Sequence, residues 1–335
     1  MIPINSFRDY VKNRHYGCYI ISRRPLILTS YWHDFRLNYE KLGEILPADI
    51  SVWMIFQIGY YKSEEAAREI RNEISEYQAQ HPNFHFWFQN NSLEEDKRFK
   101  ALGLNSLFIN QNAFLDEKRY RIIPGKKRYD AIYLARFTPV KRHFLAKNIK
   151  KLLLIGSYKP SESDYYQESR TILAHADYKE KIWGKEVSRY MNKAHVGLCL
   201  SDLEGAMFVS TEYLLSGLPV VSTESLGGRD IYYQGEYARI VAADPEVIAN
   251  EVYKLIESSP EAQDIRNETL RIMLAHRRKF IEFIQGIYEQ QKVTRDFSKE
   301  WDTVFIHKMG LRARVPYSVY KRKIVSSHFT YTNIE

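Results

Sequence analysis

Residues 201–230 read SDLEGAMFVSTEYLLSGLPVVSTESLGGRD and decide the fold. Two glutamates in this stretch, Glu204 and Glu212, lie between a strand-like apolar run and a second apolar run, GLPVV, at residues 217–221. Carboxylates that follow a strand in this way lie at the carboxyl edge of a parallel sheet, where open α/β folds bind ligands. The stretch therefore predicts an α/β fold with a ligand site beside Glu204.

The spacing of Glu204 and Glu212 suits an elongated ligand rather than a shared proton. If both were helical, their offset would place the carboxylates roughly 80° apart around the axis and about 12 Å apart along it. Gly205 instead indicates that Glu204 lies in the loop before a helix and that Glu212 lies within that helix. The helix macrodipole alone also favours glutamate near a helix start, so the pair by itself leaves both explanations open.

Composition and length describe an ordinary globular chain with room for two domains. The 335 residues are 44% hydrophobic and 27% charged, as in typical soluble proteins, and a domain usually has about 100 to 200 residues. No apolar run reaches the roughly 18 residues of a membrane span, and the first residues lack the apolar core of a secretory signal. With only Cys18 and Cys199, we expect no disulfide framework and a reducing cytoplasm.

The C-terminal segment is strongly basic in a chain whose formal net charge is +8. Residues 311–323 read LRARVPYSVYKRK, and this mixture of basic, aromatic and apolar side chains predicts contact with an anionic membrane surface, where each basic side chain contributes about 1 kcal/mol. Nucleic acid is a competing partner, and a solvated basic tail is a third explanation. We expect a peripheral position at the inner face of the membrane and no nucleic acid.

Short apolar runs alternate with amphipathic segments from about residue 25 onward, which is the pattern of βα units and a parallel sheet. In the first half, a helix is expected over residues 63–80 with Ser63 as its N-cap. Residues 111–128 contain a Pro-Gly turn and several basic residues, and they are expected to be a linker. The expected strands of this half are residues 26–29, 51–57, 84–88 and 106–109.

A second alternating series follows, so the second half is also expected to be a Rossmann-like sheet. Residues 260–309 are polar with few helix breakers, which predicts long terminal helices that pack across both halves. The expected strands lie in residues 129–136, 150–156, 195–201, 218–222 and 237–242. The expected helices are residues 161–174, 185–193, 206–215 and 245–258.

Two cations and several glycines accompany the glutamates. In ARFTPVKRH, residues 135–143, Arg136 follows a strand and Lys141 stands at the expected start of a helix. Unpaired backbone N–H groups and positive charge suit such a place to a diphosphate, although both residue types are also commonplace in surface loops. Gly156 and the pair at residues 227–228 follow apolar runs, where glycine either admits a ligand or merely turns the chain.

Across roughly residues 130–255 the order of these features resembles glycosyltransferase family 4, the group 1 glycosyltransferases, which are retaining enzymes of the GT-B fold. Those enzymes carry Gly-Arg and then Lys-Gly after the first strand of the second domain; here the glycines are replaced, but Arg136 and Lys141 keep both cations. Their pair of glutamates separated by seven residues corresponds to Glu204 and Glu212, and the GLPVV run follows. The Gly-Gly pair at residues 227–228 and the Asp-Pro pair at residues 244–245 also match.

The resemblance implies a role for each matching residue. Arg136 and Lys141 would hold the diphosphate of a nucleotide-sugar donor and stabilise the charge that develops as the sugar leaves. Glu204 would bind hydroxyls of the donor sugar, and Glu212 would bind the ribose. The backbone that would line the sugar and phosphate comprises Gly205, Ala206, Met207 and Phe208, with Gly156 nearby and the nucleobase near Ile182, Trp183 and Gly184. The resemblance implies no metal and no cofactor, and it assigns no general base.

Two departures from the family pattern bear on the reaction. An aromatic residue and a glycine usually follow the Glu-Gly pair, whereas this chain has Ala206 and Met207, so the sugar pocket is expected to differ in shape. The first domain also lacks the Gly-rich turn after its opening strand and reads TSYWHDF there. His33 and Asp34 in that segment are expected to contact the acceptor or the donor phosphate, unless they serve only a structural purpose.

These expectations combine into a GT-B chain, two Rossmann-like domains facing a cleft with C-terminal helices crossing between them. Residues 1–125 would bind acceptor, residues 126–285 would bind donor, and residues 286–335 would form a terminal helix and the basic tail, packed back on the first domain. The expected activity is transfer of a hexose from a nucleoside diphosphate sugar, with retention, to a glycan or lipid-linked saccharide in cell-surface polysaccharide synthesis. The alternatives are an epimerase-like GT-B enzyme and a non-catalytic nucleotide-sugar-binding protein.

Overall fold

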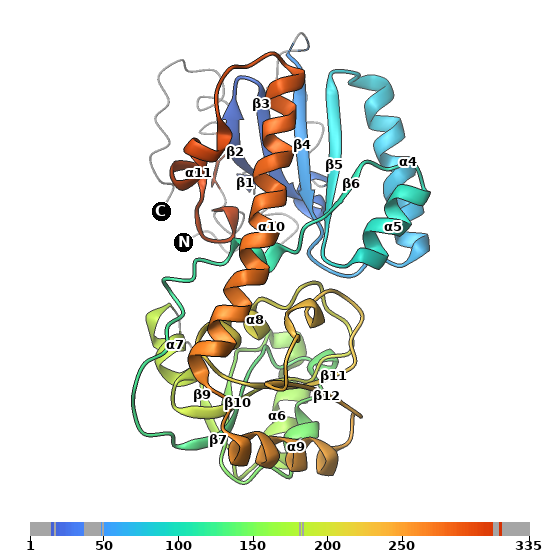
Figure 1. Ribbon diagram of the computed structural model, residues 1–335. Coiled ribbons are helices and arrows are strands. Elements are labelled where there is room, and N and C mark those ends of the chain that lie inside the picture. Colours follow the sequence, from blue (N-terminus) through green and yellow to red (C-terminus); the bar gives the residue numbers. More distant parts are fainter. Residues whose placement is uncertain are drawn as a thin grey trace. The chain divides into compact units, whose positions relative to one another are not determined.

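The computed structural model describes residues 15–16, 18–36, 48, 50–180, 182, 184–310 and 315–316. The chain forms two compact units, coloured along the sequence in Figure 1. The first unit comprises Met1–Phe114 and Ala275–Glu335, and the second comprises Leu115–Leu274. No helix among the residues described is long and apolar enough to cross a membrane.

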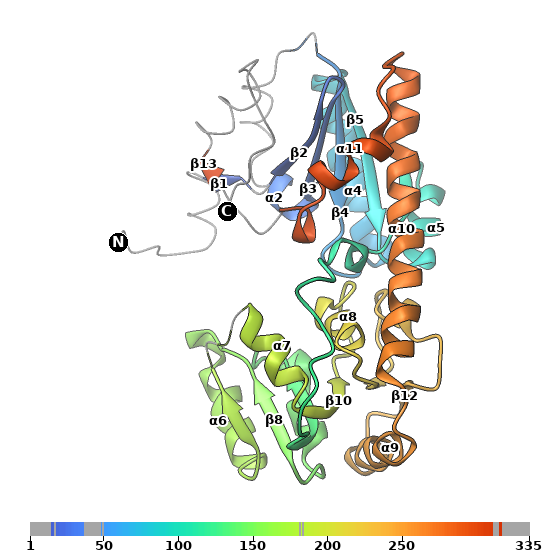
Figure 2. The same ribbon diagram turned by 60° about the vertical axis from the view of Figure 1, so that its left-hand side comes forward.

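The second unit contains a six-stranded parallel sheet with the order β12-β11-β10-β7-β8-β9. This is the order of a doubly wound Rossmann sheet, in which the chain starts in the middle, builds one side and then returns to build the other. Its strands are β7 (Tyr129–Leu134), β8 (Leu152–Ile155), β9 (Asp177–Lys179), β10 (Ala194–Cys199), β11 (Val220–Thr223) and β12 (Ala238–Val241). Its helices are α6 (Ser163–Ile172), α7 (Lys185–Met191), α8 (Phe208–Leu215) and α9 (Pro245–Ser258), which are visible in Figure 2.

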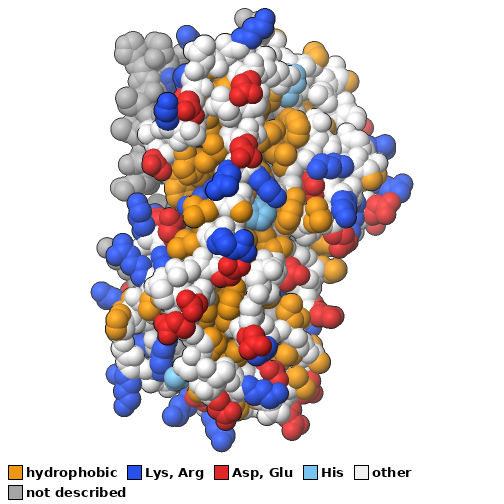
Figure 3. Space-filling view, in the orientation of Figure 1, with side chains coloured by type: hydrophobic (Ala, Val, Ile, Leu, Met, Phe, Trp, Pro, Cys, Tyr) orange, Lys and Arg blue, Asp and Glu red, His pale blue; other side chains and the backbone are white. Residues whose placement is uncertain are grey.

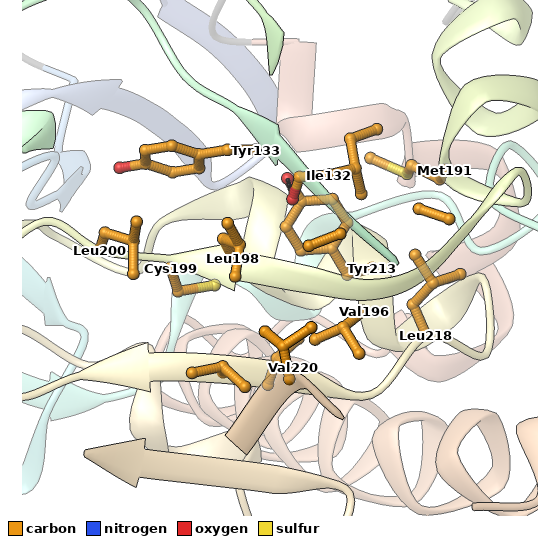
Figure 4. Packing of buried hydrophobic residues seen from close by; sticks show 14 of the residues in the cluster. Ile132, Tyr133, Met191, Val196, Leu198, Cys199, Leu200, Tyr213, Leu218 and Val220 are labelled. Atoms are coloured by element: carbon orange, nitrogen blue, oxygen red, sulfur yellow. Dashed lines mark hydrogen bonds between the residues drawn. The ribbon is translucent and has the colours of Figure 1, made fainter. Parts of the chain in front are cut away.

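The core of this sheet fixes α8, the helix that follows Glu204, against the central strands. Figure 4 shows the ring of Tyr213, from α8, lying among side chains of β7 and β10. A Cβ atom on Gly197 of β10 would come within 2.4 Å of that ring, so glycine is needed for this close approach. The Tyr213 hydroxyl accepts a 2.7 Å hydrogen bond from the backbone N–H of Leu134, which ties α8 to the carboxyl end of β7.

The first unit contains a five-stranded sheet with the order β2-β3-β4-β5-β6. The pairs from β3 to β6 are parallel, and β2 is an antiparallel edge strand. The strands are β2 (Cys18–Arg23), β3 (Leu26–Tyr31), β4 (Val52–Gln57), β5 (Phe84–Asn90) and β6 (Ser106–Phe108). The helices and short pair in this part of the chain are α2 (Trp32–Arg36), α4 (Glu64–Gln80), α5 (Leu93–Ala101), α11 (Phe297–Val304), and β1 (His15–Tyr16) with β13 (Val315–Pro316).

Side chains that alternate along β4 supply two separate cores, one on each face of this sheet. Met54 and Phe56 pack in a cluster with α4, whose N-cap Ser63 accepts from the Ala66 N–H as predicted. Trp53 and Ile55 pack in another cluster with the later part of α10 and with α11. Burial on both faces is the condition that a parallel sheet requires, and here the C-terminal helices provide the second cover.

The long helix α10 (Ala262–Gln290) belongs to both units: its residues up to Leu274 lie in the second and those from Ala275 in the first. The domain boundaries predicted from the sequence follow residues 125 and 285, whereas the compact units change after residues 114 and 274. Two contacts account for the difference. The guanidinium of Arg266 donates to the Glu117 carbonyl at 2.9 Å, which ties the expected linker to the second unit. Phe280 and Ile284 are buried in the core of the first unit.

Several elements lie outside the sequence predictions. Edge strands β2 and β9 and helix α5 were not predicted, and residues 111–114 form a buried 3₁₀ turn instead of an exposed linker. β9 has three residues and is partly exposed, so it carries too little apolar periodicity to be recognised. The buried turn depends on side-chain amides, because Asn91 Oδ1 accepts from the Gln111 N–H at 3.0 Å and Asn110 Oδ1 accepts from the Asn112 N–H at 2.9 Å.

Candidate functional site

The strand order of the second unit sets the place of the site. From β7 the sheet extends through β8 on one side and through β10 on the other, so the carboxyl ends of β7 and β10 form the topological switch point. Ligands of open α/β sheets bind in the crevice outside such a point. The loop after β7 carries Arg136 and Lys141, and the loop after β10 carries Glu204.

Lys141 and Glu204 meet at this switch point. The Lys141 ammonium forms an ion pair with Glu204 Oε1, and the two side chains are only 18% and 8% exposed. Ser201 donates a 2.6 Å hydrogen bond to the same carboxylate oxygen. Two residues that lie 63 positions apart in sequence are therefore held together in a largely dehydrated place, where charge interactions are stronger than in water.

Lys141 lies in a short 3₁₀ turn and not at the start of an α-helix, so the predicted helix is wrong here. The turns Pro139–Lys141 and His143–Ala146 are separated by Arg142, which has φ 48° and ψ 48°. A left-handed residue ends a right-handed helical run. The Tyr133 hydroxyl donates to the Lys141 carbonyl at 2.7 Å, so β7 itself holds the turn in place.

Arg142 stands where the family pattern has glycine, and its contacts offset the cost of its left-handed backbone. Its Nε donates to the Leu200 carbonyl at 2.8 Å, and its Nη2 donates to Thr223 Oγ1 at 2.7 Å. Its Nη1 also lies 3.7 Å from Asp202 Oδ2. Arg142 thus joins the loop after β7 to the carboxyl ends of β10 and β11.

Arg136 is not in contact with the Lys141–Glu204 pair. Its side chain is 45% exposed, and its Nε lies 3.3 Å from Glu162 Oε1. Gly156, the other predicted residue nearby, is needed for packing, because a Cβ atom there would come within 2.0 Å of the Ala135 carbonyl oxygen. The proposed diphosphate role of Arg136 and the donor-binding role of Gly156 stay predictions.

The Glu204 loop turns into α8 through buried residues. Gly205 and Ala206 are buried, and Phe208 begins α8. Met207 has φ 47° and ψ 79°, so the backbone keeps the left-handed conformation that suits the glycine of the family pattern. The predicted positions of Glu204 before the helix and Glu212 inside it are confirmed.

The SLGGRD segment, residues 225–230, is hydrogen-bonded to the Glu204 loop, and a single 3₁₀ turn, Asp230–Tyr232, begins at its end. The Glu204 N–H donates to the Leu226 carbonyl at 3.0 Å, and the Gly228 N–H donates to the Gly205 carbonyl at 3.0 Å. A Cβ atom on Gly227, whose φ is +124°, would come within 2.5 Å of the Glu204 carbonyl oxygen. The two loops are therefore paired backbone to backbone, which explains the glycine.

Arg229 completes the support and was missed by the sequence analysis. It is 2% exposed; its Nη1 donates to Ser201 Oγ at 2.9 Å, and its Nη2 donates to the Thr223 carbonyl at 2.7 Å. Because Ser201 in turn donates to Glu204, the guanidinium fixes the hydroxyl that holds the carboxylate. The available signal was a basic residue directly after Gly-Gly, but arginine is so rarely buried that sequence alone favours a surface position.

Glu212 lies apart from these contacts, inside α8. Its side chain is buried, and its Oε1 accepts a 2.8 Å hydrogen bond from the Tyr120 hydroxyl. Tyr120 was expected in a linker but is itself buried. The ribose-binding role of Glu212 stays a prediction, and Tyr120 is a neighbour that any ribose contact must accommodate.

The remaining predicted residues lie elsewhere. His33 is exposed on α2 of the first unit, whereas Asp34 beside it is buried. The two side chains therefore differ in access to a ligand, and their acceptor role stays a prediction. Trp183 lies outside the described residues, as does most of the basic segment 311–323.

His143 links the site to the pH dependence of folding. Its ring stacks on Phe137, and burial, reinforced by nearby Lys141, lowers its pKa to about 3. In the unfolded chain this imidazole binds a proton near pH 6.5, whereas in the folded chain it stays neutral until about pH 3. The free energy of unfolding therefore falls as the pH drops from 6.5 toward 3. Burial likewise lowers the pKa of His276, to about 4, which adds an effect of the same sign.

We expect the His143→Phe variant to lose part of this dependence. In the wild type, His143 contributes a slope that approaches about 1.4 kcal/mol of unfolding free energy per pH unit well below pH 6.5. Urea denaturation at several pH values between neutrality and mild acid measures the slope. If the free energy of unfolding of the variant changed with pH as steeply as that of the wild type, His143 would not have a lowered pKa in the folded chain.

Comparison with known proteins gives the family of the region that holds these contacts. Residues 129–258 match the family model described as "Glycosyl transferases group 1". No curated protein matches the chain in sequence. The match begins at β7 and ends with α9, so it covers the whole sheet that carries Lys141 and Glu204.

Solved structures with a similar fold are glycosyltransferases or related sugar enzymes at low identity. HepE of Anabaena, in complex with UDP and glucose, has a TM-score of 0.57 and 14% identity over 75% of this chain and 81% of its own. The pneumococcal O-GlcNAc transferase GtfA, in complex with UDP and GlcNAc, has a TM-score of 0.54 and 14% identity over 76% and 54%. Sucrose-phosphate synthase from Thermosynechococcus elongatus has a TM-score of 0.54 and 13% identity over 79% and 73%.

At such identities these likenesses establish the fold, and the family match assigns the domain. The sequence-based expectation of a GT-B fold with two Rossmann-like domains is confirmed. Residues 129–258 thus match the group 1 glycosyltransferase family model, within a chain of the GT-B fold.

Proposed function

We propose that this protein transfers a hexose from a nucleoside diphosphate sugar, with retention of configuration, to a saccharide or lipid-linked saccharide. The observation that carries the proposal is the largely buried Lys141–Glu204 pair at the topological switch point. A cation and a carboxylate side by side are the two groups that a nucleotide sugar needs, because its diphosphate is anionic and its sugar hydroxyls are hydrogen-bond donors. UDP in the structures of HepE and GtfA supports the same reading.

In this proposal Lys141 acts on the leaving group. Negative charge builds on the diphosphate as the bond to the sugar breaks, and a preorganised ammonium in a site of low water content stabilises that charge. Tyr133 and the 3₁₀ turn keep the lysine backbone fixed, so little reorganisation is needed during the reaction. Arg136, on the same loop, would add a second cation after leaving Glu162.

Glu204 plays two opposing parts. Its carboxylate accepts hydrogen bonds from hydroxyl groups of the donor sugar. As an anion paired with Lys141, it also competes with the diphosphate for the lysine ammonium. Ser201 keeps the carboxylate in place while Lys141 turns to the phosphate. No general base is assigned among the residues of the site.

Replacing Glu204 with alanine is expected to slow transfer about 10- to 150-fold, because a charge-assisted hydrogen bond is worth about 1.5 to 3 kcal/mol. Wild type and variant are incubated with a panel of nucleotide sugars, and both released nucleoside diphosphate and the glycosylated product are measured. Glu257→Ala, an exposed glutamate of α9, is the matched control. Transfer that is unchanged in Glu204→Ala would contradict the role given to this carboxylate.

The same panel separates the alternatives. An epimerase-like enzyme would change the sugar nucleotide without a glycosylated product, and a non-catalytic binder would be stabilised against heat by a nucleotide sugar without consuming it. On the face shown in Figure 3, Lys and Arg side chains are interspersed with Asp and Glu, so this face offers no continuous basic surface to a nucleic acid. We further propose a role in cell-surface polysaccharide synthesis at the inner face of the membrane, tested by binding of the full chain to anionic vesicles.

A further inference from the structure

A pocket opens next to the loop that carries Glu204, at the carboxyl ends of β11 and β12. Its volume is about 890 Å³, within the range of pockets that bind small ligands. It lies entirely within the second unit, and neither the family pattern nor the roles proposed above use it. The residues that matter for its chemistry are Arg142, Asp202, Glu224, Leu226, Asp230 and Ile240.

The pocket adjoins the site through a shared wall. Leu226 lines the pocket, and its carbonyl accepts from the Glu204 N–H at 3.0 Å. Asp202 also lines it, and its carbonyl accepts from the Leu226 N–H at 2.9 Å. Glu204 therefore belongs to the same backbone hydrogen-bond ladder as Asp202 and Leu226, which form part of the pocket wall. A ligand in the pocket would lie next to the sugar that Glu204 is proposed to bind.

The charges of the pocket disfavour a phosphate. Both of its cations are already engaged: Arg142 donates to Leu200 and Thr223, and the guanidinium of Arg229 is buried against Ser201 and Thr223. Three carboxylates, those of Asp202, Glu224 and Asp230, line the space, and the Asp202 side chain is 57% exposed. An anionic ligand would meet carboxylates without a free cation.

The same lining suits a neutral sugar. Carboxylates accept hydrogen bonds from hydroxyl groups, and pockets for small ligands combine apolar surface with a few polar groups. Leu226 and Ile240 are 51% and 49% exposed, so two aliphatic side chains are open to the C–H face of a sugar ring. Such a mixture fits a hydroxyl-rich ligand that carries no phosphate.

We propose that this pocket binds the saccharide acceptor. The inference rests on the proposed function and extends it, because it assigns an uncharged, hydroxyl-rich glycan to a pocket of the donor-binding unit. It also makes Glu224 and Ile240 determinants of acceptor choice, separate from the residues that hold the donor.

The test blocks the pocket without touching the donor site. In Ala243→Trp, a bulky ring is introduced at an exposed lining residue, and in Glu224→Ala one carboxylate is removed. Ser258→Trp and Glu257→Ala, at exposed positions outside the lining, are the matched controls. Saturation-transfer NMR of the full chain with methyl glycosides, maltose, lactose and cellobiose measures saccharide binding, and thermal shift with nucleoside diphosphates measures donor binding.

We expect a saccharide of this panel to bind wild type and both controls, and its affinity to fall about tenfold or more in Ala243→Trp and Glu224→Ala, while nucleoside diphosphate binding is unchanged. Wild-type saccharide affinity in Ala243→Trp would overturn the inference, and so would a chain that binds a nucleoside diphosphate but no panel saccharide. A wild type that binds no nucleoside diphosphate would instead refute the proposed function, on which the inference rests.

Discussion

Sugar transfer by the Lys141→Met variant is expected to be about 10²- to 10³-fold slower in kcat, the cost of removing one preorganised group that stabilises developing negative charge. Methionine keeps the length and apolar stem of lysine but lacks the ammonium that meets Glu204 Oε1. Steady-state kinetics with the donor found in the nucleotide-sugar panel measure the effect. The loss should appear in kcat more than in KM, because the charge grows as the transition state forms.

The control is Lys147→Met, an exposed lysine of the same unit, which should transfer at the wild-type rate. Glu204 keeps its hydrogen bond from Ser201 in the Lys141 variant, so the chain should remain folded, and a melting curve verifies this. If Lys141→Met were folded and had the kcat of the wild type, the proposed catalytic role of the Lys141 ammonium would be wrong.

Arg229→Met is expected to destabilise the chain by about 3 to 5 kcal/mol, since it deletes two buried hydrogen bonds from a charged donor, each worth about 1.5 to 3 kcal/mol. The variant loses the hydrogen bond to the Thr223 carbonyl at the end of β11 and the hydrogen bond to Ser201 Oγ. Methionine fills most of the space but offers no donor. Urea denaturation followed by circular dichroism gives the change in the free energy of unfolding.

Arg229→Lys should recover part of this stability, because lysine keeps a positively charged donor. It lacks the two guanidinium nitrogens that reach Ser201 and Thr223 at the same time. The exposed Arg189→Met is the matched control and should leave the transition unchanged. An Arg229→Met protein as stable as the wild type would mean that the guanidinium is not required to hold the SLGGRD segment against the Glu204 loop.

The parts of the fold that follow from local pattern were predictable. The apolar runs that form β4, β7, β10 and β11 have the length and the β-branched or aromatic content of buried strands. Helix α9 was predicted at its observed bounds, Pro245–Ser258, and the structure shows that local features set its start: Asp244 is the N-cap and Pro245 is the first helical residue. Among the missed elements, the edge strand β9 depends on its partner β8, from which helix α6 separates it in the sequence.

In the candidate site, too, some residues could be predicted from a local motif and others could not. Glu204 and Lys141 were identified because they match a spaced motif, and the structure brings them into contact. Their supports were not identifiable: Ser201 and Arg229 act through side-chain hydrogen bonds between separate loops, which leave no periodicity in the sequence. The left-handed backbone of Arg142 was hidden for a related reason, since a non-glycine residue gives no signal for it.

The central claim is that Glu204 and a nucleoside diphosphate compete for the ammonium group of Lys141. The most direct measurement is calorimetric titration of wild type, Lys141→Met and Glu204→Gln with the nucleoside diphosphate that stabilises the wild type against heat. The account predicts changes of opposite sign: affinity falls in Lys141→Met and rises in Glu204→Gln, because the ammonium loses its anionic competitor. Equal weakening in both variants, or no change in either, would contradict it.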